Sequence, residues 1–436
     1  MKILIASDLH YPVLNGVATF SRNLAKGLAD RGHEVIVIAP SQDGKRSVEV
    51  DGNYRIFRTR STIFPFYQNF RISLSPQLEV RKIIQEFEPD VIHIQMLLAI
   101  GQATMFFGKR YDIPVVTTSH AMAENLMDNL KKMAAFSRPI NYMLSEYGRR
   151  FHSRADVITS PTELGIKAFG KHAEKVTKPI EIISNGVDLS QYAPAERDEA
   201  IMKKYGLPTD IPIVTYIGRV DAEKHLSVLL EAMARVIEHT PAHLLLVGGG
   251  VDEEHLQKLA LELGIASSVT FAGRVSDEDK LALEHVGSLY AISSPAELQS
   301  IATLEAMACG QPVVAVDAGA LPELCHDGEN GFLFPLDDHE KMAEGIEKII
   351  TNPELRERFS RESLAIAQTH NIDYTLDKFL DLYDEVIEQK RAEIADRPTL
   401  KDRLMDNDFF EYIRGVRDSD GDDELRDLSD DDLRKL

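Results

Sequence analysis

Short apolar runs alternate with amphipathic stretches along the first half of the chain, and this rhythm constrains the fold more than any other feature. The runs are rich in valine and isoleucine, as is typical of strands buried on both faces of a sheet. Between Val17 and Arg31 apolar residues recur at helical spacing, and Gly32 follows as a candidate helix end. Strand, helix and strand in succession predict a parallel sheet with right-handed crossovers. The expected strands are 2–6, 34–38, 91–95, 114–118 and 157–160.

The same rhythm starts again after about residue 195, so we predict a second α/β domain. A length of 436 residues also exceeds what one ordinary core supports. The clearest helix of this half extends from Leu226 to Ile237, and a later one begins at about Asp373. The expected strands are 212–217, 243–247, 269–272, 288–292 and 312–316.

Charge and composition restrict the class of protein. A net charge of −21 argues against a nucleic-acid binder, which needs a basic surface. Two cysteines, Cys309 and Cys325, cannot form a disulfide framework, which favours a reducing compartment. The N-terminus lacks a signal-peptide pattern and no apolar stretch is long enough to span a membrane, so we expect a cytoplasmic protein. Residues 401–436 hold 13 acidic and 7 basic side chains, and we expect them to be mobile.

Gly16 lies in the segment HYPVLNGVATF, where the first expected strand leads into the first expected helix. A glycine there lets the backbone approach a ligand at the positive end of the helix. Many sheets of this type have a glycine at that turn for its geometry alone, so the segment by itself leaves both interpretations open.

Two cations follow the first expected strand of the second half. Arg219 and Lys224 lie in GRVDAEKH, before the helix that begins at Leu226. Because open α/β sheets bind ligands at the carboxyl ends of their strands, this pair suits a diphosphate. The alternative is a pair of solvated cations balanced by Asp221 and Glu223.

Two glutamates eight positions apart, Glu297 and Glu305, bracket the start of another expected helix in SSPAELQSIATLEAMACG. Carboxylates accept paired hydrogen bonds from vicinal hydroxyls, which sugars and ribose both present. The amides of residues 298–301 are candidates to receive a phosphate at the helix start. Glu305 is flanked by apolar residues, so its charge requires a partner.

These motifs in this order resemble glycosyltransferase family 4, whose members have the GT-B fold. The E-x7-E pair followed by A-M-A-C-G, the G-R-x-x-x-E-K motif, S-N-G-V-D at 184–188 and N-G-V at 15–17 carry the likeness, which covers roughly residues 1–390. It implies an α/β protein with two Rossmann-like domains facing across a cleft. The implied boundaries are 1–192, joined by a returning helix at about 370–392, then 193–369, and the acidic tail at 396–436.

The resemblance also implies roles for individual residues. Glu297 contacts the donor hexose and Glu305 the ribose hydroxyls. Arg219 and Lys224 bind the diphosphate and help it depart. His120, in TTSHAMAEN, reaches the donor sugar, and Asn185 neighbours the site. The other implied donor contacts are Gly16, Gln299, Ser300 and Ile301, with Gly273, Arg274 and Val275 near the base.

The family retains anomeric configuration without a metal ion, and we accordingly expect neither a metal nor a cofactor beyond the donor. No Asp-x-Asp motif follows an upstream strand to offer a cation site. The donor is expected to be UDP-glucose, UDP-galactose or GDP-mannose. No carboxylate is obviously placed as a nucleophile, so the resemblance implies attack by the acceptor on the face that the diphosphate leaves.

The segments ELQSIATLEAMA and HAMAEN resemble those of bacterial lipid glycosyltransferases, which implies a diacylglycerol-like acceptor. Two basic and aromatic segments, 54–78 and 130–154, suit reversible docking to the inner face of an anionic membrane. Their alternative is a packed hairpin and a solvated helix face. The cations expected to dock are Lys131, Lys132, Arg149 and Arg150.

Other functions remain as alternatives to lipid glycosylation. A soluble acceptor such as an inositol phosphate or a sugar fits the same donor site. A nucleotide-sugar 2-epimerase shares the architecture, but we expect it to lack the combined G-R-x-x-x-E-K and E-x7-E motifs. An oxidoreductase is disfavoured because no G-x-G-x-x-G follows the first strand. The intact charged set also disfavours a non-catalytic sensor.

Overall fold

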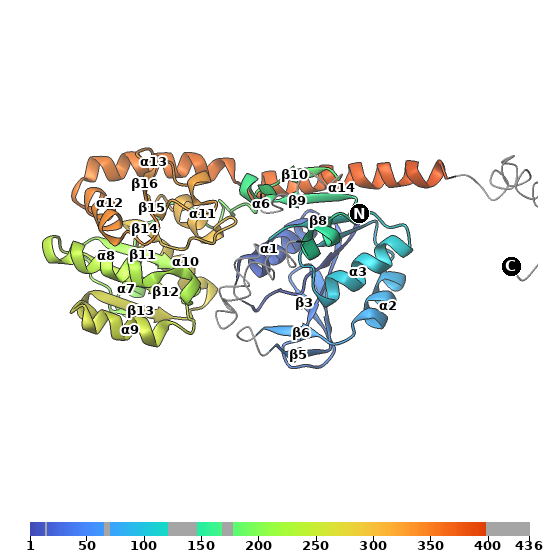
Figure 1. Cartoon of the computed structure of the whole chain (residues 1–436), viewed down its shortest axis with the longest axis horizontal. Helices are drawn as coiled ribbons and strands as arrows, with labels where there is room; N and C mark the ends of the chain where they lie inside the picture. The colour runs from blue at the N-terminus through green and yellow to red at the C-terminus, as the bar shows by residue number, and fades with distance from the viewer. Residues whose placement is uncertain (14, 65–69, 121–145, 168–177, 398–436) are drawn as a thin grey trace, which may run out of the picture. The chain divides into compact units, whose positions relative to one another are not determined.

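The computed structural model describes the chain apart from residue 14 and residues 65–69, 121–145, 168–177 and 398–436. Residues 1–387 form one compact unit that contains two parallel sheets, each with helices packed on its faces (Figure 1). This arrangement confirms the predicted α/β class and the alternation of strands and helices.

The first sheet has the strand order β10-β9-β8-β7-β1-β2-β4-β3, parallel except for β3. Its central strand β1 lies between β2 and β7. The five expected strands are present, and the structure adds β3, β4 and β10. The bounds are β1 Lys2–Ala6, β2 Glu34–Pro40, β3 Ser47–Asp51, β4 Tyr54–Thr59, β7 Val91–Ile94, β8 Val115–Thr118, β9 Val157–Ser160 and β10 Ile180–Ile182.

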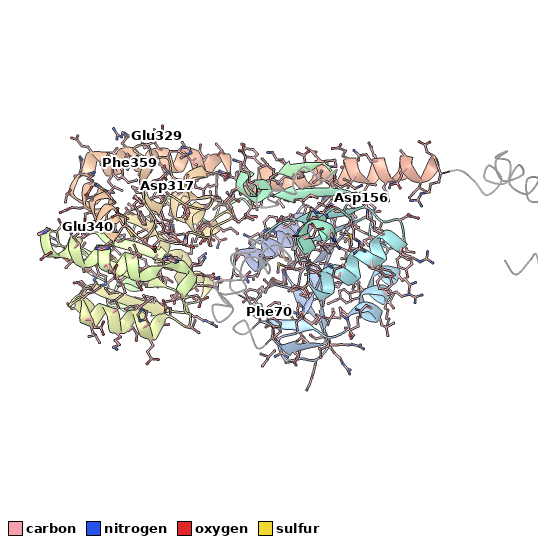
Figure 2. The ribbon with its side chains drawn as sticks, viewed as in Figure 1. Phe70, Asp156, Asp317, Glu329, Glu340 and Phe359 are labelled. Atoms are coloured by element: carbon pink, nitrogen blue, oxygen red, sulfur yellow. The ribbon has the colours of Figure 1, made fainter. Side chains whose placement is uncertain are left out.

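The second sheet has the order β13-β12-β11-β14-β15-β16 and is wholly parallel. All five expected strands are confirmed, and β16 extends the sheet. Phe359, labelled in Figure 2, is fully buried beside this sheet, with its ring 5.3 Å from that of Phe332. The bounds are β11 Ile213–Ile217, β12 His243–Val247, β13 Val269–Gly273, β14 Leu289–Ile292, β15 Val313–Val316 and β16 Gly331–Phe334.

The helices connect these strands and cover both sheets. In the first half they include α1 Gly16–Asp30, α2 Gln77–Phe87, α3 Ala99–Arg110 and α6 Glu163–Lys167. In the second half they are α7 Glu199–Tyr205, α8 Leu226–His239, α9 Glu253–Glu262, α10 Asp277–Glu284, α11 Ile301–Ala308, α12 His339–Thr351, α13 Pro353–Thr369 and α14 Ile372–Ala395. Among the described helices none is long and apolar enough to cross a membrane.

Helix α14 returns to the first sheet, as the family resemblance implied. Phe379 is fully buried there, with its ring 5.9 Å from that of Phe20 and 5.1 Å from that of His93. Tyr383 is also fully buried, and its hydroxyl lies 2.6 Å from Nδ1 of His93. A segment far along the chain therefore completes the core of the first half.

The segment 54–78 is largely packed, so its interpretation as an aromatic and basic surface is wrong for several residues. Tyr54, Arg58 and Phe70 are all buried (Phe70 is labelled in Figure 2). Arg58 pairs with Glu49 on the neighbouring antiparallel strand β3. The rest forms a hairpin of β5 Ser61–Ile63 and β6 Arg71–Ser73, and residues 65–69 lie outside the described part.

We predict that Phe379→Ala lowers the free energy of unfolding by about 3–5 kcal/mol, because the truncation leaves a cavity between α14 and the first sheet. Thermal unfolding measures the loss. Tyr374→Ala is the matched control, since Tyr374 is an aromatic residue of the same helix that is 59% exposed. Equal effects of the two substitutions would contradict the docking of α14.

Candidate active site

The second sheet reverses its direction of growth at β11. From β11 the chain proceeds to β12 and β13 on one side and then returns to β14 on the other. Loops that leave the carboxyl ends of β11 and β14 therefore diverge, and open sheets bind ligands at such a switch point. The motif GRVDAEKH follows β11, and SSPAELQS follows β14.

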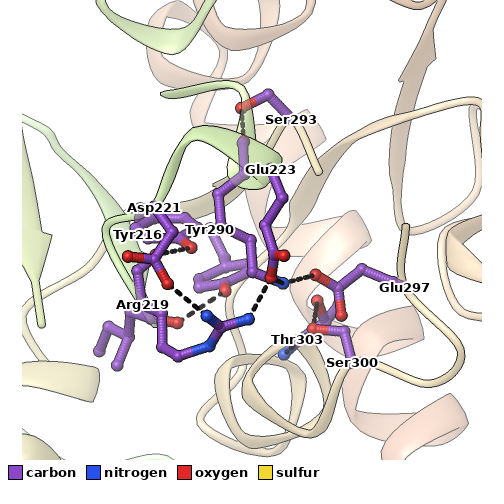
Figure 3. A network of polar contacts seen from close by, with 11 residues as sticks. Tyr216, Arg219, Asp221, Glu223, Tyr290, Ser293, Glu297, Ser300 and Thr303 are labelled. Atoms are coloured by element: carbon purple, nitrogen blue, oxygen red, sulfur yellow. Dashed lines mark hydrogen bonds and ion pairs between the residues drawn. The ribbon is translucent and has the colours of Figure 1, made fainter. Parts of the chain in front are cut away.

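Arg219 is held by two carboxylates of its own loop. Its guanidinium is bonded to Asp221 and to Glu223, and its backbone oxygen accepts a hydrogen bond from the Tyr216 hydroxyl at 2.8 Å (Figure 3). Glu223 belongs to the short 3-10 helix Ala222–Lys224 and is buried. The alternative in which Asp221 and Glu223 balance the loop cations therefore holds for Arg219.

Lys224 instead reaches across to the other loop. Its Nζ lies 2.7 Å from Oε1 of Glu297, and its backbone oxygen accepts a hydrogen bond from Ser293 Oγ at 3.0 Å. Burial raises the pKa of Glu297, but the charges of Lys224 and Arg219 outweigh burial and hold that pKa below its usual value. The pair joins the loops after β11 and β14 into one ionised cluster.

Glu305 lies among apolar residues, so its charge requires a partner, and a lysine provides one. Lys280, on α10, places its Nζ 2.5 Å from Oε2 of Glu305 and 3.2 Å from the Tyr192 hydroxyl. Burial alone would lower the pKa of Lys280, but the charge of Glu305 raises it above its usual value. The sequence analysis missed Lys280, because a lysine in an acidic amphipathic helix gives no signal of a contact with α11.

A second carboxyl, Glu284, lies in the same cluster and is fully buried. Neither of its oxygens has a hydrogen-bond partner within the described residues. Burial raises the pKa of Glu284 well above its usual value, and Lys280 only partly opposes this. One lysine neutralises one carboxylate, and Lys280 bonds to Glu305, so Glu284 is held protonated.

The polar residues at the start of α11 are used within the chain. Oε1 of Gln299 accepts the backbone N–H of Asn185 at 2.7 Å, and its Nε2 donates to the oxygen of Pro161. Ser300 caps α11 by accepting the N–H of Thr303, which Figure 3 includes. Ile301 is buried. The side chains of Gln299 and Ser300 therefore have partners within the chain that shape this loop.

The residues expected near the base follow β13. Gly273 has a positive φ of 64°, which turns the chain after the strand. Arg274 is exposed, and Val275 packs partly on the core of the second sheet. Among them, only Arg274 presents a charged side chain to solvent.

The first sheet has its own switch point, between β1 and β7. Gly16 is the first residue of α1, and a Cβ built there would meet nothing within 4 Å. His120 follows β8, and its Nε2 lies 2.7 Å from Oε1 of Gln95, which follows β7. Burial lowers the pKa of His120 to about 3, so its imidazole is neutral at physiological pH. Gln95 is a site residue that the sequence analysis missed.

Asp8, another polar residue at that edge, has a structural role. Its carboxylate accepts the backbone N–H groups of Ile100 and Gly101 at the start of α3. Burial raises the pKa of Asp8 to about 6, although these N–H groups favour its charged form.

The expected docking cations are only partly described. Lys131 and Lys132 lie outside the described residues. Arg149 and Arg150 both bond to Glu146, at 2.7 Å, with side-chain exposures of 17% and 74%. Phe151, from the same segment, is buried.

No three His, Cys, Asp or Glu side chains gather as a metal site in the part of the chain that the structure describes. Cys309 and Cys325 are free thiols.

Two family models match the chain in sequence. Residues 14–191 match the model described as Glycosyltransferase Family 4, and residues 197–364 match the model of Glycosyl transferases group 1. The boundary between the two matches falls between the two sheets.

Three curated relatives illustrate the range of similar proteins. Alpha-monoglucosyldiacylglycerol synthase of Streptococcus pneumoniae is 24% identical over 93% of this chain and 91% of its own length. D-inositol 3-phosphate glycosyltransferase of Mycolicibacterium smegmatis is 30% identical over 75% of this chain and 74% of its own length. GDP-mannose-dependent alpha-mannosyltransferase of the same organism is 26% identical over 78% and 86%.

Solved structures share the fold. Sucrose-phosphate synthase from Thermosynechococcus elongatus aligns with a TM-score of 0.75 and 20% identity, covering 89% of this chain and all of that one. An Anabaena protein solved in complex with UDP-glucose aligns with a TM-score of 0.67 and 21% identity over 88% of this chain and all of its own. These likenesses show the GT-B fold.

We predict that Glu284→Gln makes unfolding less sensitive to alkaline pH. An unfolded Glu284 ionises above its ordinary pKa of 4.5, whereas the folded carboxyl keeps its proton. Between the unfolded and the folded pKa the wild type therefore loses about 1.4 kcal/mol of stability per pH unit, and this loss continues until the folded pKa is reached. Glutamine mimics the protonated form at every pH. Thermal unfolding of both proteins from about pH 6 to 9 measures the difference; parallel curves would mean that Glu284 is ionised when folded.

Proposed function

Because the chain belongs to glycosyltransferase family 4 and has the GT-B fold, we propose that it transfers a hexose from a nucleotide-diphosphate sugar to a diacylglycerol-like lipid. The observation that carries the proposal is the ion pair between Lys224 and Glu297 at the switch point of the second sheet, with Arg219 in the same loop as Lys224. This cluster combines cations for a diphosphate with a carboxylate for sugar hydroxyls.

Charge balance suggests how the donor enters. Arg219 and Lys224 face three carboxylates, those of Asp221, Glu223 and Glu297. Because these carboxylates outnumber the cations, a diphosphate would find no unpaired cation unless one of the ion pairs exchanges partners. We propose that Glu297 turns to the hydroxyls of the hexose and thereby releases Lys224 to the phosphate oxygens.

The second cluster suits the ribose of the donor. Glu305 accepts hydrogen bonds from the two ribose hydroxyls, while Lys280 lies within hydrogen-bond distance of this buried carboxylate and balances its charge. The base lies near Gly273, Arg274 and Val275. The backbone at Gly16 approaches the donor from the first sheet, and a Cβ built on Gly16 would meet no atom of the chain within 4 Å.

We propose that the reaction retains configuration and needs no metal ion. Arg219, Lys224 and backbone amides stabilise the charge that grows on the departing diphosphate. The acceptor hydroxyl attacks the anomeric carbon on the face that the diphosphate leaves, and its proton passes to the leaving phosphate. His120, neutral beside Gln95, binds the donor sugar without adding charge.

The lipid acceptor is supported by how much of this chain aligns with one relative. The alpha-monoglucosyldiacylglycerol synthase aligns over 93% of this chain, whereas the inositol phosphate enzyme of higher identity aligns over 75%. That second relative supports the alternative of a soluble acceptor. The Anabaena complex and the diacylglycerol enzyme together make UDP-glucose the first donor to test. Docking to the inner face of the membrane through Lys131, Lys132, Arg149 and Arg150 remains part of the proposal.

We predict transfer from UDP-glucose to diacylglycerol in anionic vesicles, undiminished by EDTA, with an α-linked product. The assay compares UDP-glucose, UDP-galactose and GDP-mannose, with lipid vesicles or with inositol phosphate as acceptor. Product only with the soluble acceptor would replace the lipid proposal. A β-linked product would exclude retention, and loss of activity in EDTA would exclude metal independence.

We predict that Lys224→Met and Glu297→Gln each lower kcat by on the order of 100-fold to 1,000-fold, because each removes a contact to the transition state. Each single substitution also leaves a largely buried partner uncompensated, with exposures of 14% and 15%. The double substitution restores neutrality, so it should unfold near the wild-type temperature while remaining inactive. Glu329→Gln, at an exposed carboxylate labelled in Figure 2, is the control. An active, stable double variant would refute the assignment.

A further inference from the structure

Gln95 lies where the first sheet changes direction. It follows β7, and its backbone N–H bonds to the oxygen of Ala6 at the end of β1, at 2.8 Å. Its side chain is buried and directs Oε1 to Nε2 of His120, 2.7 Å away, at the end of the neighbouring strand β8. The Phe20 ring, fully buried on α1, lies 5.0 Å from the imidazole and restricts its tilt.

This contact fixes the position of a proton. A carbonyl oxygen only accepts hydrogen bonds, so Nε2 of His120 must carry the hydrogen. A neutral imidazole then has a bare lone pair on Nδ1, which accepts a hydrogen bond and cannot donate one. An amide turned the other way would place the hydrogen on Nδ1, which is the opposite state.

Two other buried histidines at this edge, His93 and His152, are bonded by hydroxyl groups, which do not determine where the ring proton lies. His93 is bonded by the hydroxyls of Tyr383 and Thr118, and His152 by that of Thr117. A hydroxyl donates or accepts, so these contacts by themselves select neither tautomer. Only Gln95, among the described partners of these three histidines, is an obligate acceptor in this orientation.

The Gln95 side chain also leaves one of its own polar groups without a partner, which a residue that only fills space would not do. Nε2 of Gln95 is buried and has no hydrogen-bond partner within the described residues. An apolar side chain of similar shape would leave no such donor unpaired. The amide is therefore explained by its oxygen, which faces His120.

We propose that Gln95 is a positioning residue that holds His120 as the Nε2–H tautomer, so that Nδ1 accepts a hydrogen bond from a hydroxyl of the donor hexose. The assignment of that hydroxyl rests on the proposed function, whereas the tautomer does not. Among the described residues, the titratable groups that interact with His120 are His93 and His152, with Tyr383 behind His93. Burial lowers the pKa of His93 to about 3 and that of His152 to about 4, so both are neutral during turnover.

The first test is the ¹⁵N NMR spectrum of histidine-labelled full-length protein, with His120→Ala to assign the resonance. We expect the shifts of the Nε2–H tautomer in the wild type and a mixture of tautomers in Gln95→Leu. An Nδ1–H tautomer in the wild type, or an unchanged spectrum in Gln95→Leu, would overturn the proposal without reference to activity.

The second test is kcat against pH, between about pH 5.5 and 9, in the donor assay. The wild type should show no inflection from His120, since its pKa is about 3. Gln95→Leu should lower kcat by on the order of tenfold at every pH, the effect of one lost hydrogen bond, with an unfolding temperature equal to or above that of the wild type.

Gln95→Glu keeps the acceptor but adds a charge, which raises the pKa of His120 and protonates Nδ1 at low pH. Its activity should therefore be depressed in acid and recover as the pH rises. Gln257→Glu, an exposed glutamine on α9, is the matched control and should follow the wild type. A Gln95→Glu profile identical to that of the wild type would refute the proposal. A fully active His120→Ala would instead remove His120 from the proposed function and leave the tautomer result standing.

Discussion

Buried carboxylates need buried cations, and this requirement organises the candidate site. Glu297 and Glu305 lie at the edge of the second sheet, and each is bonded to a lysine from another segment: Lys224 after β11 and Lys280 on α10. Because an unpaired charge is costly in such surroundings, the two pairs tie α10, α11 and the strand-end loops together. The same contacts that hold the loops also gather the charges on which the proposed binding of a sugar nucleotide rests.

The two sheets contribute differently to the chemistry. The edge of the second sheet holds ion pairs, such as that between Lys224 and Glu297. The edge of the first sheet holds neutral groups, where burial keeps His93, His120 and His152 uncharged and hydrogen bonds fix their orientation. This division suits a reaction in which the diphosphate accumulates charge while the sugar and the acceptor hydroxyl are positioned by neutral contacts.

Helix α14 packs against the residues that end the strands of the first sheet. Tyr383 and Phe379 come from the far end of the described chain and pack against His93, which bonds in turn to Thr118 on β8. Tyr383, 290 positions along the chain from His93, thereby helps to fix the strand end that precedes His120. A sequence pattern of one helix predicts its apolar face, but it does not say which sheet that face covers.

The sequence by itself determined the two sheets and the charged residues of the site, because buried strands leave continuous apolar runs and because Arg219, Lys224, Glu297 and Glu305 stand in recognisable motifs. Only the tertiary structure decided the partners. Lys280, Glu284 and Gln95 lie in ordinary helix and strand contexts, and their roles arise from contacts across the fold. The tertiary structure likewise decided that Arg58 and Tyr54 are buried and are not exposed for contact with a membrane. Burial and pairing depend on neighbours in space, and local spacing along the chain does not encode them.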